Sequence, residues 1–233
     1  MVKFVKIILI LFSIVLIGFA VNWGYQVFKK PMELVVLISP GNYKSAKSSW
    51  QVYEDDFDEN ETSLITKYYL AALSQVESGG NAWATPKWRW RWTTDISRIY
   101  APASSSVGLF QYTNATFEDA KRFCIHWGKS IQTGSWYDFR SCWFNRWYTR
   151  LSAADSIEMT SARLDFYIRQ LKDKSSRVNY QNLASVIHLC GLQKGKQFVL
   201  DGFKFVSFQR CGSHDVKRYV KRVQKYKRIF QKM

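Results

Sequence analysis

The sequence has few of the residues from which metal sites and acidic surfaces are built. Its 233 residues include four cysteines and three histidines, and no two cysteines form a C-x-x-C pair. This spacing argues against a zinc ribbon, and no motif implies a metal or a cofactor. Acidic residues are also scarce, with 18 Asp and Glu against 34 Lys and Arg. The net charge of +16 suits an anionic partner, such as an acidic polymer, an acidic membrane face or nucleic acid.

Alternating β patterns and internal repeats are nearly absent, whereas helical periodicity is common. An apolar content of 47% excludes wholesale disorder, and the length suits one domain with an appendage. The sequence therefore predicts a mainly α domain, with a small β-hairpin within 197–208 around Asp201-Gly202. Helices are predicted from Ser63 to Ser78, from Thr116 to Trp127, from Ser152 onward, over Asn182–Leu189 and over Asp215–Phe230.

The first thirty residues predict the compartment. Lys3 and Lys6 precede an apolar run from Ile7 to Val21, which a mixed stretch continues to Phe28. From Ile7 to Phe28 the 22 residues make about 33 Å of helix, enough to cross a hydrocarbon core of about 30 Å. We expect a membrane anchor over 1–30, with a cleaved signal peptide or a buried core helix as alternatives. The prediction is a single-pass inner-membrane protein with its domain in the periplasm, or a secreted or periplasmic protein if the segment is cleaved.

An exported location predicts that the four cysteines form disulfides, because disulfides persist in oxidising compartments. Four cysteines allow three pairings. We expect the two local pairs, Cys124–Cys142 and Cys190–Cys211, each closing a loop of about twenty residues. Free buried thiols are the alternative.

Beyond the anchor, composition divides the chain at about residue 62. Residues 31–62 contain Pro40-Gly41, a Ser- and Lys-rich stretch and six carboxylates between Glu54 and Glu61, so this segment is predicted to be a tether. The helical periodicity begins at Ser63, and 63–233 is predicted to be one domain.

Glu77 ends the first strongly amphipathic helix, directly before two glycines. A carboxylate in this place has apolar packing on one side and a cleft on the other. Desolvation raises its pKa toward the range that a general acid needs. A solvated glutamate at a helix end is the alternative.

Two segments around this glutamate resemble the soluble lytic transglycosylases, a family related in fold to goose-type lysozyme. AALSQVESGGN at 71–81 is similar to the family's helix-Glu-Ser segment. SSSVGLFQYTNAT at 104–116 is similar to its Ser-x-x-Gly-Leu-Met-Gln-x-x-x-x-Thr segment, with Phe110 in place of Met. The stretches 161–191 and 219–223 follow in the family's order, so the resemblance covers about residues 63 to 230.

The resemblance implies a lysozyme-like fold, peptidoglycan glycan strands as substrate and Glu77 as the catalytic acid and base. It also implies that Ser78, Ser105, Gln111 and Tyr112 bind the glycan or orient Glu77. The substrate's own acetamido group would stabilise the cationic centre, so no second carboxylate is needed. By analogy, such an enzyme opens the wall locally for a secretion or conjugation apparatus.

The chain departs from the family pattern at two places. The family's Ala-Tyr-Asn-x-Gly segment, whose Tyr hydrogen-bonds the catalytic Glu, is replaced by IHLCG at 187–191. His188 therefore takes the place of the Tyr, either as a partner of Glu77 or as a structural histidine. The loss of the Tyr-Asn pair leaves open a non-catalytic, peptidoglycan-binding or scaffold domain.

The second departure is the long interval between Glu77 and Gly108, about twice that of the family, which contains a Trp-Arg segment. Tryptophans and arginines alternate from Trp88 to Trp92, so Trp88 and Trp90 face one side. Indole faces suit sugar rings and arginines suit carboxylates; packing on the core and contact with a membrane interface are alternatives. Asp95 in this segment is the base that a hydrolytic muramidase would use.

The C-terminal segment 217–233 carries eight Lys and Arg and no acid. A solvated helix face explains it, as does binding to an anionic wall polymer or membrane. Nucleic acid is not an expected partner, because no recognition motif accompanies the charge and the chain is exported.

Overall fold

The computed structural model describes residues 2–29, 44–135, 138, 141–171, 177–206 and 209–233. The chain divides into two compact units. We call Met1–Pro40 with Thr85–Ser105 the anchor unit, and Gly41–Ala84 with Ser106–Met233 the helical unit.

The anchor unit contains the apolar N-terminal helix and a small hairpin. Helix α1 (Val2–Lys29) is long and apolar enough over Lys3–Phe28 to cross a membrane. Strand β1 (Trp88–Trp90) pairs antiparallel with β2 (Tyr100–Pro102), and the 3-10 helix η1 (Ile96–Arg98) lies between them. The N-terminal helix and the disulfides described below fit a periplasmic or membrane-anchored protein.

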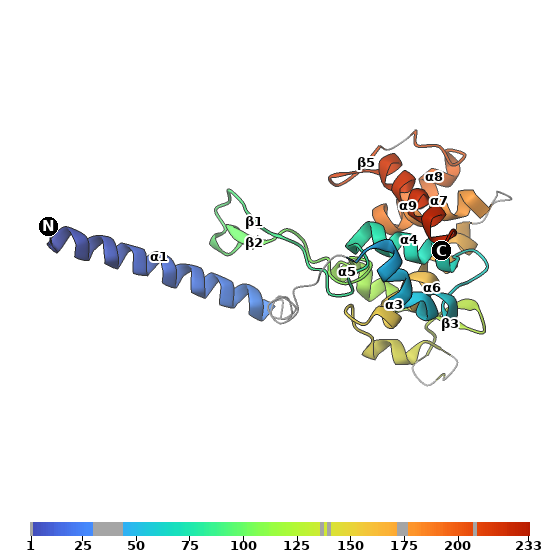
Figure 1. The fold of residues 1–233 in the computed structure, drawn as a ribbon, viewed down its shortest axis with the longest axis horizontal. Helices are drawn as coiled ribbons and strands as arrows, with labels where there is room; N and C mark the ends of the chain where they lie inside the picture. Colours follow the sequence, from blue (N-terminus) through green and yellow to red (C-terminus); the bar gives the residue numbers. More distant parts are fainter. Residues whose placement is uncertain (1, 30–43, 136–137, 139–140, 172–176, 207–208) are drawn as a thin grey trace. The chain divides into compact units, whose positions relative to one another are not determined.

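The helical unit confirms the prediction of a mainly α chain. Its elements, in order, are α3 (Ala46–Glu59), α4 (Lys67–Ser78), α5 (Asn114–Ala120), β3 (Phe123–His126), β4 (Lys129–Gln132), η2 (Trp143–Trp147), α6 (Ala153–Leu171), α7 (Arg177–Cys190), α8 (Leu192–Leu200), β5 (Arg210–Cys211), β6 (His214–Asp215) and α9 (Val216–Phe230). Helix α4 packs most extensively against α9, and α3, α6 and α7 surround this pair (Figure 1). Within the described residues, its strands form two antiparallel hairpins, β3–β4 and β5–β6.

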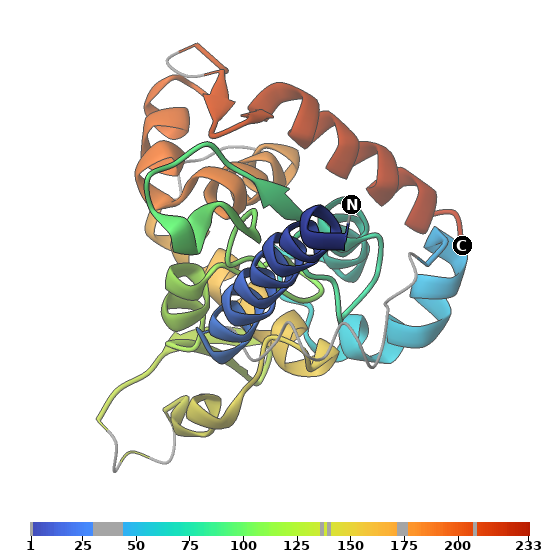
Figure 2. The same ribbon diagram turned by 90° about the vertical axis from the view of Figure 1, so that its left-hand side faces the viewer.

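Helix α3 corrects the predicted tether over 31–62. Trp50, Tyr53 and Phe57 are spaced by three and four residues, and all three are buried in the core. Most of the carboxylates on this helix face solvent. The C-terminal end of α9 lies beside α3, where the Phe230 ring packs 5.7 Å from that of Trp50 (Figure 2). The acidic composition of this segment therefore concealed one buried apolar stripe. The rest of the predicted tether, residues 31–43, lies outside the described residues.

Local capping determines where several predicted helices begin and end. Ser152 accepts a hydrogen bond from the Asp155 amide at the start of α6, as its spacing predicted. Asp215 caps α9 by accepting from the Arg218 amide.

Two local predictions were wrong. The helix expected over 116–127 is capped by Thr113 instead and ends at Ala120, because residues 123–126 form strand β3. Residues 197–200, expected in a β-hairpin, are the last turn of α8.

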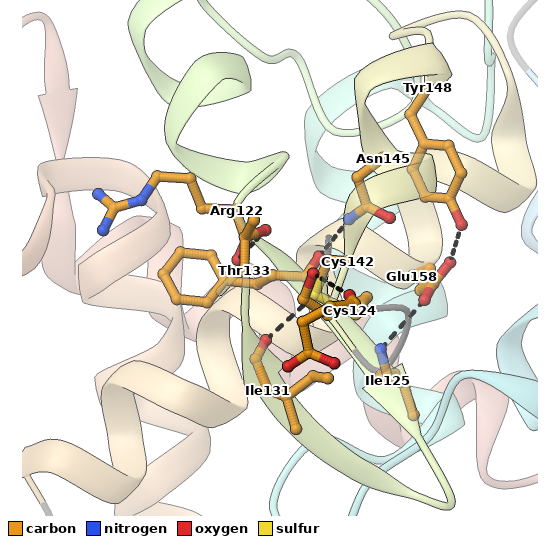
Figure 3. The surroundings of a disulfide bond; sticks show 12 residues. Arg122, Cys124, Ile125, Ile131, Thr133, Cys142, Asn145, Tyr148 and Glu158 are labelled. Atoms are coloured by element: carbon orange, nitrogen blue, oxygen red, sulfur yellow. Dashed lines mark hydrogen bonds between the residues drawn. A yellow bond between two sulfur atoms is a disulfide. The ribbon is translucent and has the colours of Figure 1, made fainter. Parts of the chain in front are cut away.

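Both local disulfides are present. Cys124 is joined to Cys142 and Cys190 to Cys211, each with 5.5 Å between the Cα atoms. Cys124 lies on β3, which pairs with β4, and the Asn145 amide donates to the Phe123 carbonyl next to the bond (Figure 3). Glu158 on α6 accepts from both the Ile125 amide and the Tyr148 hydroxyl. The disulfide thus joins the β3–β4 hairpin to the residue before η2, and the Glu158 hydrogen bonds join both segments to α6.

Candidate active site around Glu77

Helix α4 holds Glu77 one residue before its end. Thr66 caps the N-terminus of the helix, and Gly79 ends it in the left-handed conformation with φ 64°. The apolar face of α4 is buried, with Leu70 and Leu73 fully covered. The Glu77 side chain is 16% exposed. It therefore emerges from the core with little water around it and remains within reach of a ligand.

Tyr219 on α9 is the close partner of this carboxyl group. Its hydroxyl donates a hydrogen bond to Glu77 Oε1, although the residues are 142 positions apart. Burial raises the pKa of Glu77 more than the Tyr219 hydrogen bond and the positive charge of Arg222 lower it, so the pKa is about 7. Burial also raises the pKa of Tyr219 well above its ordinary value, so this residue stays a proton donor to the hydrogen bond.

His188 on α7 lies on the same carboxylate oxygen. Its Nε2 is 3.5 Å from Glu77 Oε1, which is longer than the Tyr219 contact. Burial and, to a smaller extent, the positive charge of Arg163 lower the pKa of His188 to about 3. The imidazole is therefore neutral at physiological pH. Because both neighbours contact Oε1 and no hydrogen bond to Oε2 is found among the described residues, Oε2 is the oxygen left for a ligand.

The 104–116 segment supplies the walls around His188. The rings of Phe110 and Tyr112 each lie 6.4 Å from the imidazole. Tyr112 is itself buried, and its hydroxyl pairs with Thr160 Oγ1 at 2.6 Å. It therefore borders the site through its ring, while its hydroxyl is engaged inside the core.

A tight loop before Phe110 has a glycine that the packing requires. Gly108 has φ 86°, and a Cβ there would overlap the Arg150 carbonyl oxygen. The Gln111 amide donates to the carbonyls of Ala84 and Gly108 at 3.1 and 3.0 Å, and accepts from the Ser106 hydroxyl. Gln111 thus fixes the loop that carries Phe110 and Tyr112.

Ser78 shapes the turn after Glu77. Its side chain is buried, donates to the Ser74 carbonyl at 3.1 Å and accepts from the Asn81 amide at 3.2 Å. Both of its hydrogen-bonding functions are used within the protein, so its position suits orienting the end of α4.

The other residues singled out from the sequence belong to the anchor unit. Ser105 is its last residue, and Trp88 and Trp90 lie on β1. The Asp95 carboxylate accepts from the Ser97 amide and hydroxyl and forms an ion pair with Arg98 at 3.1 Å. Asp95 is therefore engaged within its own turn.

A basic groove runs along the exposed face of α9. It has a volume of about 510 Å³, and four cationic side chains line it together with Asn182 and Phe205. The cationic residues are Lys217, Lys221, Lys225 and Arg228. Half of the basic residues of the C-terminal segment therefore line one groove, and this concentration of positive charge suits an anionic polymer.

Sequence reasoning missed the roles of Tyr219 and Arg222 at Glu77. Tyr219 falls in the apolar stripe of the last helix, between Val216 and Val220. A tyrosine hydroxyl in such a stripe needs a partner when it is buried, which was the available signal. The identity of the partner depended on how α9 packs against α4.

No protein-family model, curated protein or solved structure matches this chain. The functional proposal therefore depends on the residues described above.

Proposed function

We propose that the protein is a peptidoglycan lytic transglycosylase with Glu77 as its catalytic acid and base. The observation that carries the proposal is a poorly solvated glutamate whose pKa is about 7 and whose Oε1 is held by Tyr219. A general acid works best when its pKa lies near the working pH. Glu77 meets that requirement and keeps Oε2 for the substrate.

The first step is protonation of the glycosidic oxygen between N-acetylmuramic acid and N-acetylglucosamine. As the proton leaves Glu77 and the C1–O bond breaks, the acetamido oxygen of the muramyl residue bonds to C1 and carries the developing charge. This substrate assistance makes a second protein carboxylate unnecessary.

In the second step the same glutamate acts as a base. Glu77, now ionised, takes the proton from the C6 hydroxyl of the muramyl residue. The O6–C1 bond forms as the acetamido oxygen leaves C1, which yields a 1,6-anhydro end and returns Glu77 to its protonated state. The Tyr219 hydrogen bond and the charge of Arg222 stabilise the ionised form between the two steps.

Tyr219 supplies the hydroxyl donor that the family takes from its Tyr-Asn pair and that this chain lacks at positions 188–189. A hydroxyl donor to the catalytic carboxylate is still present, supplied by α9 rather than α7. Neutral His188 then serves as a packed wall and a weak neighbour of Oε1. The retained donor favours a catalytic domain over a non-catalytic scaffold domain.

We further propose that the protein is anchored in the inner membrane through α1, with its helical unit in the periplasm, where peptidoglycan strands are its substrate. The two disulfides support an oxidising compartment. The basic groove on α9 suits the carboxylates of wall polymer. By analogy alone, a secretion or conjugation complex would be its partner assembly.

The test combines zymography on purified peptidoglycan with mass spectrometry of the released muropeptides. We expect the wild type to release anhydro ends and Glu77→Gln to lose about 10²–10⁴-fold in rate, as when a general acid is removed. Asp95→Asn is the control and should keep its activity.

Three results would contradict the proposal. Absence of clearing by the wild type, with binding to peptidoglycan retained, would show a non-catalytic wall-binding domain. Reducing ends in place of anhydro ends would show a hydrolase. Loss of activity in Asp95→Asn would point to Asp95 as the base of that hydrolase.

A further inference from the structure

The β1–β2 hairpin presents its aromatic side chains on one face. Trp88 and Trp90 are two residues apart and so point to the same side. Their rings lie 5.1 and 4.8 Å from that of Tyr100 on the opposite strand. Trp90 is 64% exposed, and Trp92 just beyond the strand is fully exposed. Monomeric domains rarely leave indoles uncovered in such a group without a partner.

This hairpin is joined to the last turns of α1. The Asn22 amide donates to the Tyr100 carbonyl at 3.0 Å, and the Gln26 amide donates to the Ser97 carbonyl. The ring of Phe19 meets that of Trp90 edge-on, with centroids 5.5 Å apart. The hairpin therefore runs beside the C-terminal part of α1 within the anchor unit (Figure 1).

The three α1 residues in these contacts share one helical face. Phe19, Asn22 and Gln26 are spaced by three and four residues. Gln26 is only 6% exposed, whereas the apolar residues of α1 from Phe4 to Tyr25 are exposed. The hairpin thus covers the side of α1 that carries its two amide side chains.

The position of these amides along α1 sets the depth of the hairpin. Asn22 and Gln26 lie within about 10 Å of Phe28, where the segment that could cross a membrane ends. If α1 crosses a bilayer, this part of the helix lies at the boundary between hydrocarbon and headgroups. The hairpin carbonyls accept the hydrogen bonds of both amides, which keeps the amides paired wherever lipid excludes water.

We propose that the β1–β2 hairpin is a membrane-interface element that sits in the headgroup region of the leaflet from which α1 emerges. Indoles are favoured at that boundary because one end of the ring system is apolar and the other donates a hydrogen bond. Arg89, which alternates with the tryptophans and is exposed, meets the lipid phosphates. The contacts with α1 favour the bilayer over a glycan as the partner of Trp90 and Trp92.

This inference depends on α1 crossing the membrane and is independent of the chemistry at Glu77. The test uses the full chain in vesicles of phosphatidylethanolamine and phosphatidylglycerol with brominated acyl chains, which quench nearby indoles. Trp90→Phe/Trp92→Phe is compared with Trp127→Phe/Trp147→Phe, a matched pair of exposed tryptophans in the helical unit.

We expect the hairpin variant to lose about half of the bromine-dependent quenching, because Trp23 and Trp88 remain at the interface. The control pair should leave the quenching unchanged. Arg89→Glu should lower the quenching, and should lower it more in anionic vesicles than in phosphatidylcholine, because the introduced carboxylate is also repelled by anionic headgroups.

Equal quenching in the wild type and the hairpin variant would overturn the inference. If, in addition, the hairpin variant sediments less with peptidoglycan than the wild type, the hairpin binds glycan instead of lipid. Failure of the full chain to float with the vesicles would overturn it by removing the anchor, whatever activity Glu77 shows. Circular dichroism checks that each variant keeps the wild-type helix content.

Discussion

The Tyr219 hydroxyl donates a hydrogen bond to Glu77 Oε1 across the packed helices α9 and α4. This contact joins the end of one helix to the first turn of another, although the two residues are 142 positions apart in the chain. It also opposes the effect of burial on the pKa of this glutamate, which is raised to about 7 when both act. The acid strength of Glu77 therefore depends on how two distant helices pack.

Replacing Tyr219 by Phe removes a donor that stabilises the ionised form of Glu77. The pKa of Glu77 then rises, so the alkaline limb of the pH–rate profile moves to higher pH. We expect the maximal rate to fall about 10-fold as Glu77 loses its orientation. Tyr69→Phe is the control, because the Tyr69 hydroxyl bonds Ser185 instead, and its profile should match the wild type. An unshifted limb in Tyr219→Phe would show that the hydrogen bond does not tune Glu77.

Replacing Glu77 by Gln should stabilise the fold at alkaline pH. A carboxyl group whose pKa is raised on folding binds more protons in the folded state, so its presence destabilises the protein as pH rises from about 4.5 to about 7. We expect Glu77→Gln to unfold with a free energy higher by up to about 3 kcal/mol at pH 8, and equal to the wild type at pH 4. Denaturant unfolding at both pH values measures this difference, and parallel curves would contradict it.

His188 should produce the opposite pH dependence. Its pKa falls from 6.5 to about 3 on folding, so the unfolded chain binds the extra proton and stability is lost as pH drops below 6.5. At pH 5 this costs about 2 kcal/mol relative to pH 8. His188→Gln should remove that part of the slope in denaturant unfolding between pH 5 and 8. A slope equal to that of the wild type would mean that the imidazole titrates normally in the folded state.

Gly108 tests the loop that carries Phe110 and Tyr112. A Cβ at this position combines a positive φ with overlap of the Arg150 carbonyl, so Gly108→Ala should lower the free energy of unfolding by about 2–4 kcal/mol. Gly128→Ala is the control, since Gly128 has φ 69° but open space around it, and should cost about 1 kcal/mol. Equal losses in thermal unfolding would show that the overlap relaxes freely.

Local patterns in the sequence predicted much of the helical framework. The apolar run of α1, the glycine that ends α4, and Ser152 and Asp215 at helix starts each act within a few residues. The two disulfides also close short loops. Predictions failed where composition hid a buried stripe, as at Trp50, Tyr53 and Phe57 in α3.

The sequence by itself determined where several helices begin or end, as at Gly79, Ser152 and Asp215, and it marked Glu77 as a carboxylate at a helix end. Only the tertiary structure decided that Tyr219 donates a hydrogen bond to that carboxylate, that the charge of Arg222 lowers its pKa, and that Asn22 and Gln26 bind the hairpin. The physical reason is range. Helix periodicity and caps depend on neighbours within one or two turns, whereas the pKa of Glu77 depends on burial and charge from helices far away along the chain.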